Sequence, residues 1–226
     1  PNGAILTDSC CSDTASENTM MAKLMIDSAK LWSTQYQIDS FRFDLMGFHA
    51  IETMNKLKTE VAAAAGRPIY IYGEAWNFGA VGNDARFKQA RQANMFGTGI
   101  GSFNDRLRDA VRGGGCCDNG ENTISQQGFI NGVFYDKNAK STQSADDLLR
   151  LADMVRVGLA GTLRDYAFTD RTGTSKKSSE IDYAGMPAGY TADPFETINY
   201  VEAHDNQTLF DINAFKLPAN TSINDR

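Results

Sequence analysis

Two early stretches of the chain place apolar residues at helical spacing. The stretch SENTMMAKLMIDSAKLW predicts a helix that Ser16 caps at its N-terminus. The stretch AIETMNKLKTEVAAAAG predicts a second helix, with Gly66 placed as its C-terminal cap. The apolar positions are Met21, Leu24, Met25 and Leu31 in the first helix and Ile51, Met54, Leu57 and Val61 in the second.

Two stretches rich in aromatic and branched residues, YQIDSFRFDLM and IYIYGEAW, flank the second helix and predict strands. Strand, helix and strand within about 40 residues are typical of a βαβ unit with parallel strands. Further along, GIGSF predicts a short strand, NDRLRDAVRGGG and ADDLLRLADMVRVGLAG predict helices, and ETINYVEAHDNQ predicts a strand with a polar end. Residues 113–144 and 165–194 are long excursions between these elements. The pattern indicates an α/β fold, either a parallel barrel or a doubly wound sheet.

Composition and charge limit the classes of molecule that the chain is expected to bind. The chain has 226 residues, 42% of them hydrophobic and 22% charged, which suits one domain or a piece of one. The net charge of −6 argues against nucleic acid or an anionic membrane as the main partner. No apolar run reaches the length of about 18 residues that a transmembrane helix needs.

The four cysteines form two adjacent pairs, Cys10–Cys11 and Cys116–Cys117. Neighbouring Cα atoms lie about 3.8 Å apart, below the range of about 4.4–6.8 Å that disulfides usually span. We therefore expect reduced, partly buried thiols, while a bridge between the two pairs stays open. Zinc is disfavoured, because adjacent cysteines do not have zinc-ligand spacing and the chain has only two histidines.

Candidate chemistry lies where the predicted strands end. Side chains alternate along a strand, so Arg42 and Asp44 share one face and Phe41 and Phe43 share the other. In a parallel barrel the phenylalanines would face the helices, and Arg42 and Asp44 would point inward at the C-terminal edge, where barrel active sites lie. A buried Asp44 beside Arg42 would stay ionised, as a nucleophile requires.

The next strand ends in Glu74, among Tyr72, Trp76 and Phe78. Neighbouring strands lie about 4.8 Å apart, so Asp44 and Glu74 are expected at the separation of about 5–5.5 Å that retaining glycosidases use. The aromatic surroundings predict a raised pKa for Glu74, which suits a general acid. Trp76 offers a stacking surface for a sugar ring.

The last predicted strand ends in His204, Asp205 and Asn206, which add a third carboxylate and an imidazole that could hydrogen-bond sugar hydroxyls. Each motif alone has a plainer explanation: Arg42 and Asp44 as a structural ion pair, Glu74 as an exposed loop acid, and His204 as a cap. The ordered set of three carboxylates at three strand ends favours catalysis.

The strings FRFDLMGFH, GEAWNFG and YVEAHDNQTLFD resemble three signature regions of the α-amylase superfamily of glycoside hydrolases (family 13). DLMGFH and HDNQTLFD point to the pullulanase type, which hydrolyses α-1,6 linkages in pullulan and branched dextrins. CCSDTASE and FNDRLRDAVRGGG are similar to the same type, so the resemblance spans nearly the whole chain. Ser40 and Ala75 replace glycines that are common in the family, and GGGCC also departs from its pattern.

The resemblance implies that Asp44 is the nucleophile, Glu74 the acid/base and Asp205 the stabiliser of the transition state. It implies substrate-binding roles for a further set: Arg42, His204, Trp76, Asn77, His49 and Asn206. It also implies an incomplete (β/α)8 barrel, in which residues 1–226 supply about strands four to seven of a single catalytic domain. The first signature of the family is absent, so we expect these residues alone to be inactive.

The same resemblance implies α-glucan substrates, no required cofactor, and a secreted or cell-surface bacterial enzyme. A structural Ca²⁺ is compatible with the long loops, although no diagnostic calcium loop is present. An isoamylase-like or α-1,4-acting relative is the alternative enzyme. A catalytically inactive carbohydrate-binding subunit is disfavoured, because such relatives usually lose one of the acids and Asp44, Glu74 and Asp205 are all present.

Overall fold

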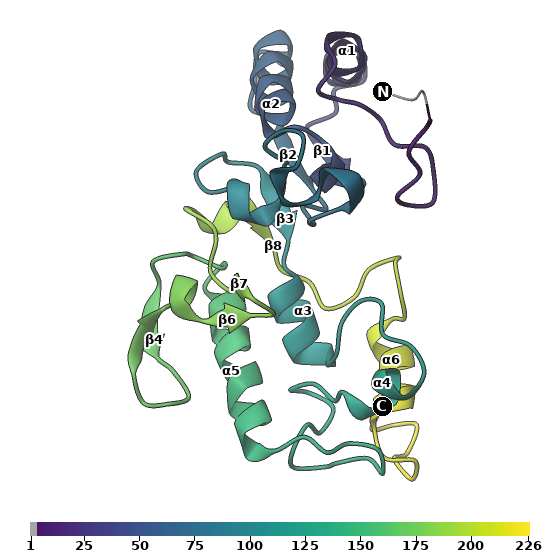
Figure 1. Ribbon diagram of the computed structural model, residues 1–226, viewed down its shortest axis with the longest axis vertical. Coiled ribbons are helices and arrows are strands. Elements are labelled where there is room, and N and C mark those ends of the chain that lie inside the picture. The colour runs from purple at the N-terminus through teal and green to yellow at the C-terminus, as the bar shows by residue number, and fades with distance from the viewer. Residues whose placement is uncertain (1–3) are drawn as a thin grey trace. The chain divides into compact units, whose positions relative to one another are not determined.

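The computed structural model describes residues 4–226, which form two compact units. The first unit ends at Phe103, and the second runs from Asn104 to Arg226. Figure 1 labels the helices and strands of both units. The expectation that residues 1–226 belong to one barrel stays a prediction.

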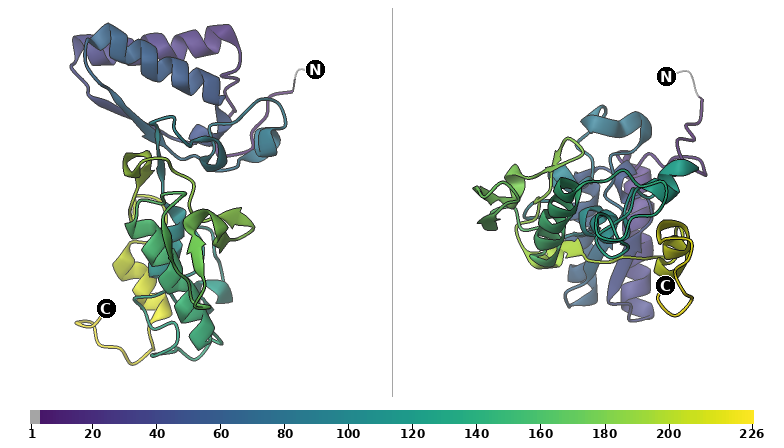
Figure 2. Two further views of the ribbon diagram at one scale, coloured as in Figure 1. Left: turned by 90° about the vertical axis from the view of Figure 1, so that its left-hand side faces the viewer. Right: turned by 90° about the horizontal axis from the view of Figure 1, so that it is seen from below.

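The first unit contains the predicted parallel βαβ arrangement. Its helices are α1 (Thr19–Gln35) and α2 (Ile51–Ala65), and its strands are β1 (Ser40–Phe43), β2 (Tyr70–Gly73) and β3 (Gly101–Phe103). Short 3-10 helices cover Met46–Phe48, Gly79–Asp84 and Gln92–Asn94. β2 lies between β1 and β3 and is parallel to both. Two views show α1 and α2 side by side next to these strands (Figures 1 and 2), which confirms an α/β fold with a parallel sheet.

The core of this unit forms between the two helices and the sheet. Ile71 of β2 and Leu57 of α2 are fully buried there, and Phe41 and Phe43 pack against the same cluster. α2 ends as predicted, with Gly66 in the left-handed conformation at φ 68°. Glycine adopts this conformation without the steric cost that a Cβ atom would add.

The prediction that Ser16 caps α1 was wrong. The helix begins after Asn18, and Ser16 is buried. The Oγ of Ser16 accepts a hydrogen bond from the Ala50 N–H at 3.3 Å. Ser16 therefore links the segment before α1 to the N-terminus of α2. Leu24 and Leu31 are 62% and 53% exposed, while the helix buries Ile26, Ala29 and Ser33 instead.

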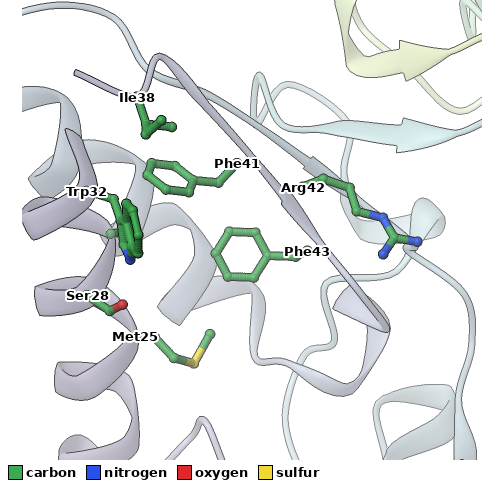
Figure 3. A pocket seen from close by; sticks show the side chains of 8 residues that line it. Met25, Ser28, Trp32, Ile38, Phe41, Arg42 and Phe43 are labelled. Atoms are coloured by element: carbon green, nitrogen blue, oxygen red, sulfur yellow. The ribbon is translucent and has the colours of Figure 1, made fainter. Parts of the chain in front are cut away.

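An apolar groove of about 450 Å³ lies between α1 and β1. Figure 3 shows Phe41 and Phe43 directed toward α1 and Arg42 directed to the opposite side of the strand. The alternation expected from the sequence is therefore present. Among the described residues of the first unit, β1 pairs with β2 alone, so its other edge has no strand partner there. The groove is lined by Met25, Ser28, Ala29, Trp32, Ile38, Phe41, Arg42 and Phe43.

The second unit is mostly helical. Its helices are α3 (Asp105–Arg112), α4 (Glu121–Ser125), α5 (Ala145–Leu159) and α6 (Leu209–Lys216). β4 (Ala167–Thr169) pairs with β5 (Ser175–Lys177), and β6 (Asp182–Tyr183) pairs with β7 (Met186–Pro187), both antiparallel. The 3-10 helices are Ser178–Glu180 and Pro194–Glu196, and β8 covers Thr197–Ile198. A separate core includes Leu151, Met154 and Val157 of α5.

The loops and the last strand of the second unit differ from expectation. The excursion at 113–144 contains α4, and the excursion at 165–194 contains both antiparallel hairpins. The stretch ETINYVEAHDNQ forms a strand only at Thr197–Ile198. The polar run from His204 to Asn206 is exposed and offers no apolar side chain to bury, so the backbone bends until Thr208 caps α6.

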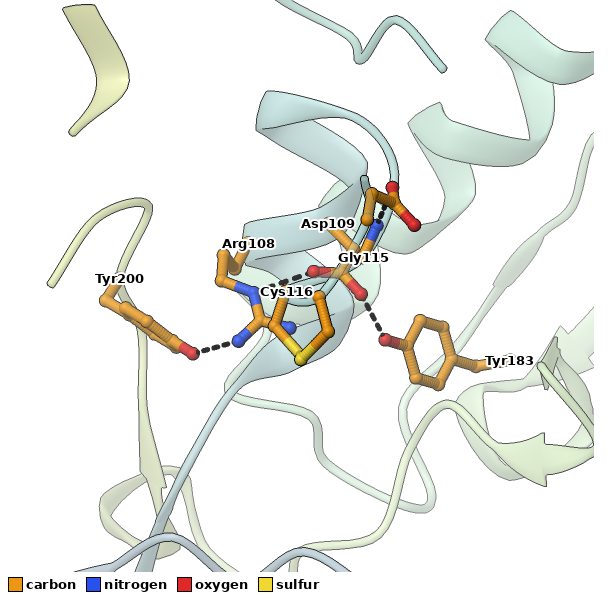
Figure 4. Close-up of a disulfide and its surroundings, with 8 residues drawn as sticks. Arg108, Asp109, Gly115, Cys116, Tyr183 and Tyr200 are labelled. Atoms are coloured by element: carbon orange, nitrogen blue, oxygen red, sulfur yellow. Dashed lines mark hydrogen bonds and ion pairs between the residues drawn. A yellow bond between two sulfur atoms is a disulfide. The ribbon is translucent and has the colours of Figure 1, made fainter. Parts of the chain in front are cut away.

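A polar network lies beside the second cysteine pair (Figure 4). The Arg108 guanidinium donates to Asp109 at 2.7 Å and to the Tyr200 hydroxyl at 2.6 Å, and Tyr183 donates to Asp109 at 2.6 Å. Burial raises the pKa of Asp109, which Arg108 opposes through its charge. These contacts compensate charges that burial would otherwise make costly.

The four cysteines divide into one bonded pair and one free pair. Cys116 and Cys117 form a disulfide, so the prediction of reduced thiols was wrong for that pair. Cys10 and Cys11 are free thiols and exposed, so they are reduced as predicted but are not partly buried.

Among the described residues, no helix combines the length and apolar character that a membrane crossing requires.

Candidate active site

Parallel pairing brings the first two predicted carboxylates together. Phe43 of β1 lies opposite Gly73 of β2 in the register, and Asp44 and Glu74 come next on their strands. The Glu74 N–H donates to the Phe43 carbonyl at 3.2 Å, which continues the strand pairing to this point. Asp44 and Glu74 therefore stand at the C-terminal ends of neighbouring parallel strands, as the sequence predicts.

Arg42 connects the two carboxylates. Its guanidinium contacts Asp44 through Nη1 and donates to Glu74 Oε1 through Nη2 at 3.0 Å. The guanidinium also lies 5.8 Å from the centre of the Phe103 ring, a cation–π distance. One planar cation thus holds both carboxylates from one side, as the fork of arginine donors allows.

The exposure of the two acids differs from the prediction. The Asp44 side chain is 67% exposed rather than buried, whereas the Glu74 side chain is only 12% exposed. Asp44 is therefore open to solvent in this structure. Glu74 is the sheltered member of the pair, and its carboxylate accepts hydrogen bonds from the Arg42 guanidinium and from a backbone N–H group.

The second donor to Glu74 is a backbone group. The Leu45 N–H donates to Glu74 Oε2 at 2.7 Å. Leu45 has a φ of 49°, a left-handed conformation that is uncommon for a residue with a branched side chain. This turn directs the amide that follows Asp44 toward Glu74, so the backbone of one acid fixes the side chain of the other.

The loops that follow the two strands pack backbone against backbone. The Gly47 N–H donates to the Glu74 carbonyl at 2.9 Å. A Cβ atom built on Gly47 would lie 1.9 Å from the Trp76 carbonyl oxygen, so only glycine fits this contact. Gln89, fully buried, donates to the Gly47 carbonyl at 2.9 Å and to the Phe78 carbonyl at 3.5 Å. These contacts hold both loops in one arrangement.

Two predicted sugar-binding residues follow Glu74 in this loop. Trp76 is half-buried. Asn77 is exposed, and its side chain is engaged within the loop, where its Oδ1 accepts from the Asn83 N–H at 2.7 Å and its Nδ2 donates to Asn83 Oδ1 at 2.9 Å. Their predicted contacts with substrate stay predictions.

His49 is buried beside Phe43, in the turn that follows Asp44. The residue is only 8% exposed. Its ring packs edge to face against the Phe43 ring, with the two ring centres 6.2 Å apart. Burial lowers the pKa of His49 to about 4, so the imidazole is neutral at pH 7. In this structure His49 has little surface to offer a sugar, and its predicted role in substrate binding stays a prediction.

The remaining predicted residues belong to the second unit. His204, Asp205 and Asn206 are exposed in the segment between β8 and α6. The His204 Nε2 lies 3.6 Å from Asp205 Oδ1. Asn206 has a φ of 65° and so turns the chain toward α6. The proximity of Asp205 to Asp44 and Glu74 stays a prediction.

Sequence reasoning missed the supporting groups of this site. The Leu45 amide carries no signal in the sequence, because any residue except proline supplies an N–H. Gly47 could have been suspected, since a glycine after a strand often marks a close approach of two backbones. Gln89 lies far along the chain in an irregular segment, and no pattern singles it out.

Within residues 4–226, no group of three or more His, Cys, Asp or Glu side chains is arranged to hold a metal ion. The compatibility of a structural Ca²⁺ with the long loops stays a prediction.

Comparison with known proteins shows that this chain is similar to pullulanases. No family model matches the chain. The chain is 45% identical over 218 residues to pullulanase of Klebsiella pneumoniae, which covers 95% of this chain and 19% of that protein. It is 40% identical over 237 residues to chloroplastic pullulanase 1 of Arabidopsis thaliana, which covers 100% of this chain and 24% of that protein. The chain therefore spans about a fifth to a quarter of the length of these relatives.

Solved structures give the same result. The maltotriose complex of PulA from Klebsiella pneumoniae matches with a TM-score of 0.94 and 44% identity, covering 99% of this chain and 24% of that chain. A mutant pullulanase from Paenibacillus barengoltzii complexed with maltotriose matches with a TM-score of 0.68 and 28% identity, covering 96% of this chain and 27% of that chain.

Proposed function

Because this chain belongs to the pullulanase type, we propose that it carries the catalytic carboxylates of a debranching enzyme. The reaction is hydrolysis of α-1,6-glucosidic linkages in pullulan and branched dextrins. The observation that carries this proposal is the single guanidinium of Arg42 in contact with both Asp44 and Glu74. The maltotriose bound in related pullulanase structures supports an α-glucan as the substrate.

The proposed mechanism retains the anomeric configuration. Glu74, protonated, gives its proton to the glycosidic oxygen while Asp44 attacks the anomeric carbon and the bond to the leaving sugar breaks. The result is a glycosyl ester on Asp44. Glu74 then takes a proton from water, which attacks the same carbon and releases the Asp44 carboxylate.

Arg42 suits both halves of this reaction. Before the first step Asp44 carries the negative charge, and the guanidinium stabilises it. When the ester forms, Asp44 loses its charge and Glu74 becomes the carboxylate, which the same guanidinium and the Leu45 amide stabilise. The charge moves from one side of Arg42 to the other, and no group must move to follow it.

Exposure agrees with this division of roles. Asp44, the open carboxylate, must reach the anomeric carbon of a polymer. Glu74, sheltered and held by two donors, must keep one orientation through two proton transfers. Asp205 is proposed as the third acid, which stabilises positive charge on the sugar ring in the transition state, with His204 beside it.

The chain is proposed to be the central part of a larger catalytic barrel. The strand edge of β1 that lacks a partner in the first unit, and the apolar groove beside it, support this proposal. A parallel barrel leaves no strand edge open when it is complete.

The test of this function is product analysis with a protein that includes this chain and the flanking sequence of its gene. Pullulan should yield mainly maltotriose, and amylose should stay intact. Cleavage of amylose would instead indicate an α-1,4-acting relative. Absence of hydrolysis on both substrates by a folded protein would refute the proposed function.

A further inference from the structure

A second reactive group lies in the same unit as the carboxylates. Cys10 and Cys11 are free and exposed, and their Sγ atoms are 2.7 Å apart. The two thiols are therefore both accessible and directed to the same side. The other adjacent pair, Cys116–Cys117, belongs to the second unit and is closed as a disulfide. The chain thus contains one adjacent dithiol and one adjacent disulfide.

The loop that carries the dithiol is held in place. The Asp13 N–H donates to the Leu6 carbonyl at 2.9 Å and closes the loop. The side chain of Asp8 then accepts a hydrogen bond from the Ala80 N–H at 2.6 Å. Ala80 belongs to the loop that follows Glu74 and β2, so the dithiol loop is attached directly to a loop of the candidate active site.

The negative charge of Asp44 affects the pKa of Cys11. The Cys10 sulfur, through its contact and its charge, raises the pKa of Cys11 most, burial raises it further, and the Asp44 carboxylate adds a smaller increase. This effect of Asp44 agrees with the contact between Asp8 and Ala80, which holds the dithiol loop against the loop that follows β2. The raised pKa keeps Cys11 mostly protonated at neutral pH, which makes it less readily oxidised than a thiolate.

We propose that Cys10 and Cys11 form a binding site for trivalent arsenicals at the edge of the candidate active site. An arsenic(III) oxide, R–As=O, condenses with the two thiols to give R–As(S–Cys)₂ and one water molecule. Two As–S bonds form, both thiol protons leave on the oxide oxygen, and arsenic keeps its oxidation state, so no oxidant is needed. Trivalent arsenic binds two sulfurs on the same side, as these neighbouring thiols present them, whereas linear two-coordinate mercury requires them on opposite sides.

The direct test is labelling with phenylarsine oxide. A protein that includes this chain and its flanking sequence, purified without reductant, is treated with the reagent and analysed by peptide mass spectrometry. One adduct is expected on the peptide that contains Cys10 and Cys11, formed with loss of water and reversed by 2,3-dimercaptopropanol. Cys10→Ser and Cys11→Ser should each abolish the reversible adduct. The matched control, in which Cys116 and Cys117 are both replaced by serine, should keep it.

Other labelling results would overturn the proposal. These are no adduct on the wild-type chain, an adduct that survives Cys10→Ser, or an adduct lost from the control variant. Circular dichroism of each variant distinguishes loss of the site from loss of the fold. Cys11→Ala serves as a second variant should the serine disturb the loop.

The consequence for catalysis rests on the proposed function. An arylarsenic group on the dithiol would stand beside Asp44 and obstruct the approach of a glucan. In a protein with pullulan-hydrolysing activity, the rate should therefore fall in proportion to the labelled fraction and recover with 2,3-dimercaptopropanol, while Cys10→Ser stays active and insensitive. Full activity in fully labelled protein would refute the obstruction. Absence of activity before labelling would refute the proposed function and leave the mass result to decide the arsenical site.

Discussion

Arg42 contacts both carboxylates that we assign to catalysis, and this shared contact leads to a prediction for Arg42→Lys. Lysine keeps the charge but presents it as a point, so it would serve one carboxylate at a time. Loss of one charge-assisted hydrogen bond corresponds to a roughly 10- to 100-fold lower kcat. Steady-state kinetics on pullulan, with thermal unfolding as the control for folding, would measure it. Wild-type kcat in Arg42→Lys would contradict the shared role of this side chain.

His49 provides a prediction about stability and pH. Burial lowers its pKa to about 4 in the folded chain, whereas an unfolded chain has a histidine pKa of about 6.5. Between these values the unfolded state binds the proton and the folded state does not, so acidification favours unfolding. The wild-type free energy of unfolding should fall relative to His49→Phe as the pH is lowered from about 6.5 to about 4, by at most roughly 3 kcal/mol.

Urea unfolding at several pH values would measure this difference. Phenylalanine keeps a ring against Phe43 and removes the titratable group, so the carboxylates that titrate over the same range cancel between the two proteins. Parallel pH curves for wild type and His49→Phe would show that His49 does not titrate as the buried structure requires.

For single residues, the sequence predicted which side chains form the candidate active site better than it predicted the surroundings of those side chains. Arg42, Asp44 and Glu74 were expected together because alternation and strand order depend only on spacing. The exposure of Asp44 was predicted wrongly, because burial depends on what packs over a strand end and spacing contains no such information. The Leu45 amide, which donates to Glu74, was missed because a backbone N–H group carries no signal in the sequence.

Among the elements, the loops after β1 and β2 touch at Gly47, and this contact gives a third prediction. Gly47→Ala places a methyl group 1.9 Å from a backbone oxygen, so one loop must shift. We expect a loss of about 1–3 kcal/mol in the free energy of unfolding, together with a fall in kcat as Glu74 moves away from Asp44. The matched control is Gly82→Ala, whose Cβ would meet only the Asn77 side chain, at 3.6 Å. Equal stability of the two variants in urea would contradict the close packing of these loops.

The elements that the sequence predicted well are those with strong local signals. β1, α2 and β2 follow from alternation, helical spacing and the Gly66 cap, and all three are present. The strand expected at ETINYVEAHDNQ covers only Thr197–Ile198, because the polar run further along this stretch stays exposed and gains little from a strand conformation. α4 and the hairpins of the second unit lie in polar, glycine-containing segments where no periodic apolar pattern marks an element.

For the whole molecule, we predict that the 226 residues alone are poorly soluble and do not hydrolyse pullulan. The reason is the open edge of β1 and the apolar groove beside it, which together expose backbone donors and apolar side chains. A protein that also contains the flanking sequence should be soluble and active. Size-exclusion chromatography and product analysis of both proteins would compare them. A soluble, monomeric chain of these residues that releases maltotriose would contradict this prediction.

The most direct test of the proposed roles of Asp44 and Glu74 is covalent labelling of the nucleophile in that longer protein. In Glu74→Gln, a fluorinated glucosyl fluoride can still transfer its sugar, because fluoride leaves without an acid, while hydrolysis of the ester lacks its base. We predict a glycosyl ester on Asp44, located by peptide mass spectrometry and absent when Asp44→Asn is added. A label on Asp205, or no label in a folded protein, would contradict it.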